Sequence, residues 1–291
     1  MSVARYLGLI IVILLWGLSF IATRIVVGSI SPLTAALVRF LVALVTLLVV
    51  PRKRKIQLFN IHKILAGFWG ITAYFAAENI ALKFTSPTNA AMIVSTAPIW
   101  YVMFTHFVYK KKTNIFHYLG SFIALIGVFV VILNGRIYLK VNPIGDALAF
   151  LAAFSWVFYT HHIVKLKDSS SIAAIFEITF WGVVTLIPFS LFEVAISPAI
   201  VVNFKGIVGL LYLGVLCSAL GYVLWNKSIE TLGDRTTTNA VYIIPVVTAV
   251  SEVIIFKRLP TLLLILGTFL VVIGLYLFEK HEERSETYGK E

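Results

Sequence analysis

Two apolar stretches decide the fold: LGSFIALIGVFVVI at residues 119–132 and LGTFLVVIGLYLF at residues 266–278. Neither contains a charged residue, and each lies in an apolar run of the kind that crosses a lipid bilayer as a helix. The second stretch repeats the first at a shift of 147 residues, in the pairs Gly120/Gly267, Phe122/Phe269 and Gly127/Gly274. These stretches therefore predict a membrane protein with an internal duplication.

The composition of the 291-residue chain indicates a membrane protein as well. It is 60% hydrophobic and 13% charged, with a mean hydropathy of +0.97. A soluble domain carries roughly 25% charged residues, so this chain lacks the polar residues to cover a surface in water. The net charge of +11 would suit nucleic acid, but the basic residues lie between the apolar runs, where they set orientation in a membrane. The single cysteine, Cys217, excludes a disulfide within the chain.

Ten apolar runs are long enough to span the hydrocarbon, which takes about 20 residues per helix. The first run could be a secretory signal peptide, but no small-residue cleavage site precedes a soluble domain, so we interpret it as a membrane helix. The turns between runs are short and leave no room for a separate soluble domain. We expect spans at residues 5–25, 32–50, 63–82, 87–109, 116–134, 144–163, 172–192, 205–228, 236–256 and 260–279.

Lysine and arginine predict the orientation of these helices. With the N-terminus in the cytoplasm, the loops on that side hold most of the basic residues, including residues 52–55 and 110–112. This bias places both termini in the cytoplasm. Residues 280–291 then form a charged cytoplasmic tail, which we expect to be disordered.

The duplication divides the chain into two repeats, residues 1–140 and residues 141–279. The shift of 147 also gives the pairs Gly67/Gly214, Asn79/Asn226 and Pro98/Pro245, and a shift of 140 sets Trp16 on Trp156. Each repeat has five expected helices. Because five is odd, the second repeat enters the membrane upside down relative to the first. Inverted repeats are typical of secondary transporters, which bind substrate near the midplane between the halves.

Six segments follow one another in an order that is specific for one family. They are LLWGLSF, AALVRF, ENIALKFTSPTNAAMIVSTAPIW, LGSFIALIGVFVVI, LWNKSIETLGDRTTTNAVYIIPVV and LGTFLVVIGLYLF. In this respect residues 5–278 resemble the EamA-type, ten-helix members of the drug/metabolite transporter superfamily. The chain differs at the ends of the fourth and ninth helices, where the family often has Gly-Glu before a basic residue. Here Lys110-Lys111 and Lys257-Arg258 stand at those positions, so no role of that glutamate is transferred.

The resemblance implies a central cavity lined by helices 1–4 and 6–9, with helices 5 and 10 supporting the bundle from outside. It also implies the transport of amino acids, other metabolites or toxic compounds. The glycine pairs of helices 5 and 10 lie seven residues apart on one helix face. They predict close helix packing, for which contact between subunits is one interpretation.

Ionisable residues inside the expected spans are the first site candidates, because each costs about 2.5 to 3.5 kcal/mol to insert. They are Arg39, Glu78, Glu177 and Glu252. Aligning AALVRF with AAIFEI sets Arg39 opposite Glu177, so one or both could face the cavity and bind a charged or zwitterionic solute. Glu78 and Glu252 could bind substrate or carry a coupling proton. The alternatives are a structural ion pair for the first two, and solvated or packed positions near helix ends for the others.

Aromatic and amide side chains in the spans form a second group of candidates for stacking on and hydrogen-bonding a solute. They are Trp16, Tyr74, Asn79, Trp100, Trp156, Tyr222, Asn226 and Tyr242. Alternatively, the aromatic residues gather at the membrane interface and the asparagines hold helices together. Pro98 and Pro245 each lie about ten residues into a span, where each frees a carbonyl and allows a kink. They are candidate hinges, and simple helix curvature is the other interpretation.

The sequence lacks the motifs of several other classes. H-E-x-x-H and G-x-S-x-G are missing, which argues against an intramembrane enzyme, and no G-x-x-x-x-G-K-[ST] is present to bind a nucleotide. His161 and His162 are adjacent, so they point about 100° apart on a helix and do not predict a metal site. We therefore expect no cofactor and no bound metal.

We predict a secondary transporter in the cell membrane, in particular an exporter of small organic solutes, with amino acids or related metabolites first. It would work by alternating access between the inverted repeats. The alternative is a lipid or lipid-linked sugar translocase. The expected partners are the solute and the bilayer, with protons and a second copy of the chain left open and nucleic acid excluded.

Overall fold

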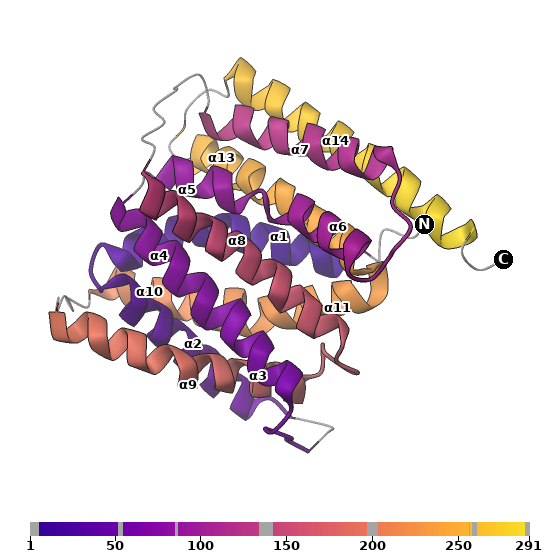
Figure 1. Ribbon diagram of the computed structural model, residues 1–291. Coiled ribbons are helices and arrows are strands. Elements are labelled where there is room, and N and C mark those ends of the chain that lie inside the picture. Colours follow the sequence, from indigo (N-terminus) through magenta and orange to yellow (C-terminus); the bar gives the residue numbers. More distant parts are fainter. Residues whose placement is uncertain are drawn as a thin grey trace.

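The computed structural model describes residues 6–51, 55–84, 87–133, 142–196, 203–255, 257 and 261–288, and it is built of helices (Figure 1). Eight helical stretches in this part are long and apolar enough to cross a bilayer. They are Leu7–Val27, Pro32–Val49, Ala90–Phe107, Ile115–Leu133, Pro143–Val164, Ile172–Ile196, Phe204–Leu232 and Leu262–Glu282. The expected spans at 63–82 and 236–256 are also helical, but the first carries two charged residues, Lys63 and Glu78, and the second is divided into shorter helices.

The described part of the N-terminal half contains eight helical elements. They are α1 (Leu7–Val27), α2 (Pro32–Val49), α3 (Ile61–Gly67), the π-helix η2 (Phe68–Ala73), α4 (Tyr74–Phe84), α5 (Pro87–Val94), α6 (Ala97–Phe107) and α7 (Ile115–Leu133). Asn60 caps α3, because its side chain accepts hydrogen bonds from the backbone N–H groups of His62 and Lys63.

The described part of the C-terminal half contains nine helical elements. They are α8 (Pro143–Val164), α9 (Ile172–Ile196), α10 (Phe204–Leu211), the π-helix η3 (Tyr212–Leu220), α11 (Gly221–Leu232), α12 (Asp234–Asn239), the 3-10 turn η4 (Ala240–Tyr242), α13 (Ile243–Ile255) and α14 (Leu262–Tyr288). Asn142 and Asn203 cap α8 and α10 in the same way as Asn60 caps α3.

The two π-helices recur at the shift of 147 residues. A π-helix interrupts the regular hydrogen-bond ladder, and such interruptions are frequent at functional sites. In both places the helix continues on either side, as α3–η2–α4 and as α10–η3–α11. Gly70 in η2 corresponds to Cys217 in η3 at this shift, and both contribute carbonyl groups to the site described below.

The two candidate hinge prolines lie next to helix interruptions. The expected span 87–109 is two helices, α5 and α6, separated by a turn at Ser95 and Thr96. Proline has no N–H and disfavours helix in the residue before it, and Pro98 lies at the start of α6. Pro245 follows the 3-10 turn η4 at the start of α13. Their movement as hinges stays a prediction.

Helices α7 and α14 lie side by side along one edge of the bundle (Figure 1). Their glycines make this contact, because a Cβ on Gly120 would lie 2.7 Å from the Gly274 carbonyl oxygen. A Cβ on Gly127 would lie 2.6 Å from the Val271 nitrogen. The predicted close packing is therefore a contact within the chain, and these glycines are not free to form an interface between subunits.

The C-terminal segment differs from the expectation of disorder, which was wrong for residues 280–288. Helix α14 continues through Tyr288, and the Glu282 side chain is 8% exposed. Buried partners explain the order, because Glu282 contacts Arg235 and His117. Glu279, one turn earlier, accepts a hydrogen bond from the Tyr6 hydroxyl at 3.0 Å, so the start of α1 lies beside this segment.

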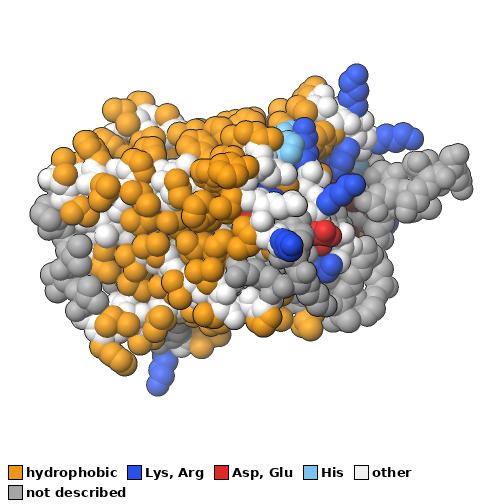
Figure 2. Space-filling view, turned by 90° about the horizontal axis from the view of Figure 1, so that it is seen from below, with side chains coloured by type: hydrophobic (Ala, Val, Ile, Leu, Met, Phe, Trp, Pro, Cys, Tyr) orange, Lys and Arg blue, Asp and Glu red, His pale blue; other side chains and the backbone are white. Residues whose placement is uncertain are grey.

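Polar contacts near the helix ends occur at two opposite ends of the bundle, since the helices run across it side by side (Figure 1). Contacts at one end join His62 to His162, Lys111 to Asp234 and Tyr6 to Glu279. Contacts at the other end join Asn203 to Ser29, Asn79 to Pro32 and Thr34 to Glu193. Figure 2 shows hydrophobic side chains over most of one face, with most of the visible lysines and arginines toward one end.

Candidate functional site

Five aromatic rings from three helices meet inside the bundle, and we call them the central aromatic cluster. They are Trp16 on α1, Trp156 and Tyr159 on α8, and Tyr222 and Trp225 on α11; none is more than 9% exposed. The Trp16 ring centroid lies 4.9 Å from that of Trp225 and 5.5 Å from that of Trp156. Residues three apart on a helix share a face, which explains why α8 and α11 each contribute two rings. The predicted candidates Trp16, Trp156 and Tyr222 thus come together.

Hydrogen bonds attach the cluster to the two π-helices. The Trp16 indole Nε1 donates to the Cys217 carbonyl oxygen in η3 at 2.9 Å. The Tyr222 hydroxyl donates to the Gly70 carbonyl oxygen in η2, also at 2.9 Å. The indole Nε1 atoms of Trp156 and Trp225 are buried and have no hydrogen-bond partner among the described residues. Two donors of the cluster are therefore unsatisfied.

A buried cation lies beside the cluster. Arg39 on α2 is 8% exposed, and its Nε donates to the Ser218 hydroxyl at 2.6 Å. The guanidinium carbon lies 5.0 Å from the Phe75 ring centroid and 5.4 Å from that of Phe40, within range of cation–π attraction. The Phe40 ring in turn lies 6.1 Å from Tyr222. Arg39 is thus held in the interior next to the aromatic rings.

A carboxylate faces the same region. Glu78 on α4 is partly buried, and Tyr74 lies one turn earlier on the same helix face. The Arg39 guanidinium interacts electrostatically with Glu78, and the Tyr74 ring lies 5.6 Å from that of Trp156. The sequence candidates Arg39, Tyr74 and Glu78 therefore border the central aromatic cluster, with a basic and an acidic side chain among them.

Glu177 lies in different surroundings from Arg39. Its side chain is fully buried and forms an ion pair with Lys63, and it accepts a hydrogen bond from the Gln57 backbone N–H. Lys63 is also buried and donates to the Gln57 carbonyl oxygen at 3.2 Å. The alternative of a structural ion pair describes Glu177, with Lys63 rather than Arg39 as the partner.

The two asparagine candidates hold helices together. Asn226 is fully buried; its Oδ1 accepts from the Tyr159 hydroxyl at 2.8 Å, and its Nδ2 donates to the Ser169 carbonyl at 3.1 Å. Asn79 donates to the Pro32 carbonyl at 3.2 Å. Asn226 therefore positions a ring of the cluster, whereas Asn79 ties α4 to the start of α2.

The remaining candidates lie outside the cluster or outside the described residues. Trp100 donates to the Thr96 hydroxyl at 2.9 Å and packs on Phe154. Tyr242 is buried in a separate group of apolar side chains from α7, α13 and α14. The side chain of Glu252 is not among the described ones.

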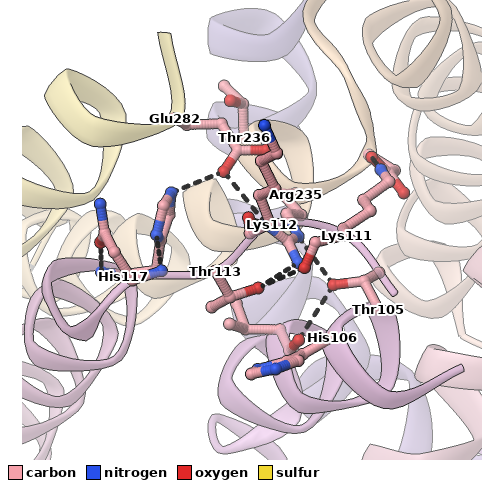
Figure 3. Close-up of polar contacts among 12 residues, drawn as sticks. Thr105, His106, Lys111, Lys112, Thr113, His117, Arg235, Thr236 and Glu282 are labelled. Atoms are coloured by element: carbon pink, nitrogen blue, oxygen red, sulfur yellow. Dashed lines mark hydrogen bonds and ion pairs between the residues drawn. The ribbon is translucent and has the colours of Figure 1, made fainter. Parts of the chain in front are cut away.

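A second polar assembly, missed by the sequence analysis, lies at the end of the bundle where α6, α7, α12 and α14 meet (Figure 3). The fully buried Arg235 donates from Nε to the Thr105 hydroxyl at 2.7 Å and from Nη2 to the Thr113 hydroxyl at 2.7 Å. Its Nη1 reaches Glu282 at 3.4 Å, and Glu282 also contacts His117 Nε2 at 2.9 Å. The partners of Arg235 are remote along the chain, so the sequence alone does not reveal this assembly.

The neighbouring Asp234 is held as a carboxylate. Burial by itself would raise its pKa, but the Lys111 ammonium at 2.5 Å and a hydrogen bond from the Tyr101 hydroxyl at 2.6 Å keep the pKa of Asp234 below its ordinary value. Beside this pair an open pocket of about 520 Å³ is lined by His106, Phe107, Thr113 and residues 110–112. Ion pairs therefore lie at this end of the bundle, next to a pocket lined by three lysines.

The sequence matches the model of a known protein family in both repeats. A model of the EamA-like transporter family matches residues 4–133 and, a second time, residues 143–279. This chain belongs to the EamA-like transporter family. It is accordingly a multi-pass membrane protein and a transporter, not an enzyme.

Relatives of this EamA transporter carry related names. An uncharacterized transporter of Archaeoglobus fulgidus is 26% identical over 288 residues, which covers 95% of this chain and 98% of the relative. Probable amino-acid metabolite efflux pumps of Salmonella typhimurium and Escherichia coli are 26% and 25% identical, covering 92% of each chain. A solved crystal structure with 19% identity has a TM-score of 0.77 over 96% of this chain and 98% of its own, which shows a shared fold.

Proposed function

We propose that this EamA transporter exports small organic solutes, with amino acids or related metabolites first, across the cell membrane. The observation that carries the proposal is the interior site in which Arg39 and Glu78 border the central aromatic cluster. Opposite charges match the two ends of a zwitterion, and aromatic rings pack on an organic side chain. The names of the two probable amino-acid metabolite efflux pumps support this substrate class.

The membrane topology that we propose has ten helices in two inverted repeats, residues 1–140 and 141–279, followed by a cytoplasmic tail, residues 280–291. The contacts at the two ends of the bundle support ten crossings. In the helical stretch Ile61–Phe84, His62 contacts His162 at one end and Asn79 contacts Pro32 at the other. A helix of 24 residues is about 36 Å long, enough for the hydrocarbon. Both termini then lie in the cytoplasm, on the basic side.

Transport would follow alternating access, with the two repeats moving around the cluster. The bonds that Trp16 and Tyr222 make to carbonyls of η3 and η2 support this, because both cross between the repeats: the first joins α1 to η3 and the second joins α11 to η2. The ion pairs of Asp234 and Arg235 would keep the cytoplasmic end closed in this state.

Coupling to protons through Glu78 is part of the proposal. A carboxylate that is partly buried beside a cation can exchange a proton when the cavity opens to either side. Glu78→Gln should abolish pH-driven transport while substrate exchange continues. Accumulation that still follows the pH gradient in this variant would refute a coupling role for Glu78.

The test of the function is counterflow in proteoliposomes that contain the purified protein and a pool of labelled L-amino acids, with protein-free liposomes as the control. Exchange above the control supports the proposal. No exchange by folded, monodisperse protein would contradict the amino-acid substrate class. A translocase of lipids or lipid-linked sugars is then tested with fluorescent lipid analogues in the same vesicles.

A further inference from the structure

Two indole N–H groups in the central aromatic cluster have no acceptor among the described residues, and this inference rests on the proposed function of that site. We propose that Trp156 and Trp225 form a subsite that binds the carboxylate of the transported solute through their indole N–H groups. Both Nε1 atoms are buried without a partner among the described residues, and the two ring centroids lie 5.6 Å apart. An indole N–H can only donate, so an acceptor from a ligand is what would satisfy it.

The equivalent tryptophans of the two repeats differ in their hydrogen bonds. Trp16 corresponds to Trp156, and Trp16 gives its N–H to the Cys217 carbonyl. The carbonyl equivalent to that of Cys217, at the shift of 147, belongs to Gly70. The Tyr222 hydroxyl already occupies it at 2.9 Å. Both equivalent carbonyls therefore already accept a side-chain hydrogen bond, and the Trp156 Nε1 has no partner among the described residues.

The two repeats carry different side chains at the position of Tyr222. The residue equivalent to Tyr222 in the first repeat is Phe75, which has no hydroxyl, so Trp16 meets no competitor at the Cys217 carbonyl. The Tyr222 hydroxyl thus donates to the Gly70 carbonyl of η2, the position where an indole N–H binds in the other repeat. A purely structural tryptophan would gain by bonding to Gly70 in the way that Trp16 bonds to Cys217.

Trp225 supplies the second donor at a position where the other repeat has an acid. At the shift of 147, Trp225 corresponds to Glu78. The central site therefore has a donor from α11 and an acceptor from α4 at equivalent places. A solute with a carboxylate at Trp156 and Trp225 and an amino group toward Glu78 would satisfy both sides.

A carboxylate fits these donors better than a neutral carbonyl. Hydrogen bonds to an ionised oxygen are shorter and stronger than those to a neutral one, and the Arg39 guanidinium next to the cluster favours negative charge. Trp156 is 8% exposed and Trp225 fully buried, so the rings must separate before a solute reaches them. Binding and opening of the cluster are then one event.

The experiment compares acids with amines in the counterflow assay. Each amino acid that wild type exchanges is competed with its unlabelled self and with its decarboxylated amine. Wild type should prefer the acid by about tenfold or more, as for a hydrogen bond to a charged group. Replacing Trp156 or Trp225 by benzothienylalanine, which keeps the ring shape and removes one N–H, should lower this preference, and replacing both should lower it further, with the remainder due to Arg39.

The controls separate the possible failures. The same replacement at Trp181, whose indole donates to the Leu58 carbonyl outside the cluster, should leave the preference unchanged. Wild type that exchanges nothing would contradict the proposed function and the subsite together. Exchange with an unchanged preference for the acid in both the Trp156 and the Trp225 proteins would overturn the subsite alone.

Discussion

The buried pair of Lys63 and Glu177 gives a prediction with a calculable magnitude. Both side chains are 3% exposed or less, and both also bond to the backbone of Gln57. Removal of one partner leaves the other charge buried without its counterion, which costs about 3–5 kcal/mol. Lys63→Met and Glu177→Gln should therefore each lower the free energy of unfolding by about this amount.

The double variant separates structure from function. Lys63→Met/Glu177→Gln contains no buried charge at this place, so its loss should be no more than about 1 kcal/mol. The coupling free energy from the double-mutant cycle is then about 5 kcal/mol or more in favour of the pair. The assay is denaturant unfolding of the protein in detergent, followed by counterflow of the refolded or untreated double variant.

Two results would refute this reasoning. Additive losses in the double variant would mean that the two side chains do not stabilise one another. A stable double variant without any counterflow would mean that Glu177 takes part in transport, as the alignment with Arg39 first indicated.

Two further predictions follow from contacts at the edge and the end of the bundle. Gly127→Leu should lower the thermal midpoint strongly, because a Cβ already meets the Val271 nitrogen at 2.6 Å and the Gly267 oxygen at 2.7 Å; overpacking costs typically about 1–3 kcal/mol, and an unchanged midpoint would contradict the α7–α14 contact. The stabilisation of Asp234 by Lys111 should be present above the ordinary carboxyl pKa and be lost as the pH falls through the lowered pKa of the folded protein. The midpoints of wild type and Lys111→Met should therefore differ at pH 7 and converge in acid, and a gap independent of pH would count against the pair.

Hydropathy and the repeat predicted much of the fold, because both can be read from the sequence without knowing which helices pack together. The apolar runs gave the helices, and the spacing of Gly120 and Gly127 gave a close contact. The partner helix was not readable, since a glycine face fits any smooth helix. The structure supplies α14, within the same chain.

The site was predictable only in part. The repeat identified Trp16 and Trp156, which meet, and the cost of burying charge identified Arg39 and Glu78, which border the same cluster. The repeat also set Arg39 opposite Glu177. Residues at equivalent positions of two repeats need not be neighbours, because each side chain pairs with the groups that pack against its own helix. Glu177 pairs with Lys63.

The assembly around Arg235 was missed for a related reason. Its partners come from α6, α7 and α14, and each of them looks like an ordinary polar residue at a helix end. A charged C-terminal segment predicts disorder unless a buried counterion is known. Here Arg235 is that counterion for Glu282, and the helix continues.

The central claim is that Arg39 belongs to the solute site of an amino-acid transporter. Counterflow of the labelled amino-acid pool by wild type, Arg39→Ala and Arg39→Lys tests it most directly. We expect exchange by wild type, loss in Arg39→Ala and partial recovery in Arg39→Lys, with all three proteins monodisperse. Full exchange by folded Arg39→Ala would contradict the claim.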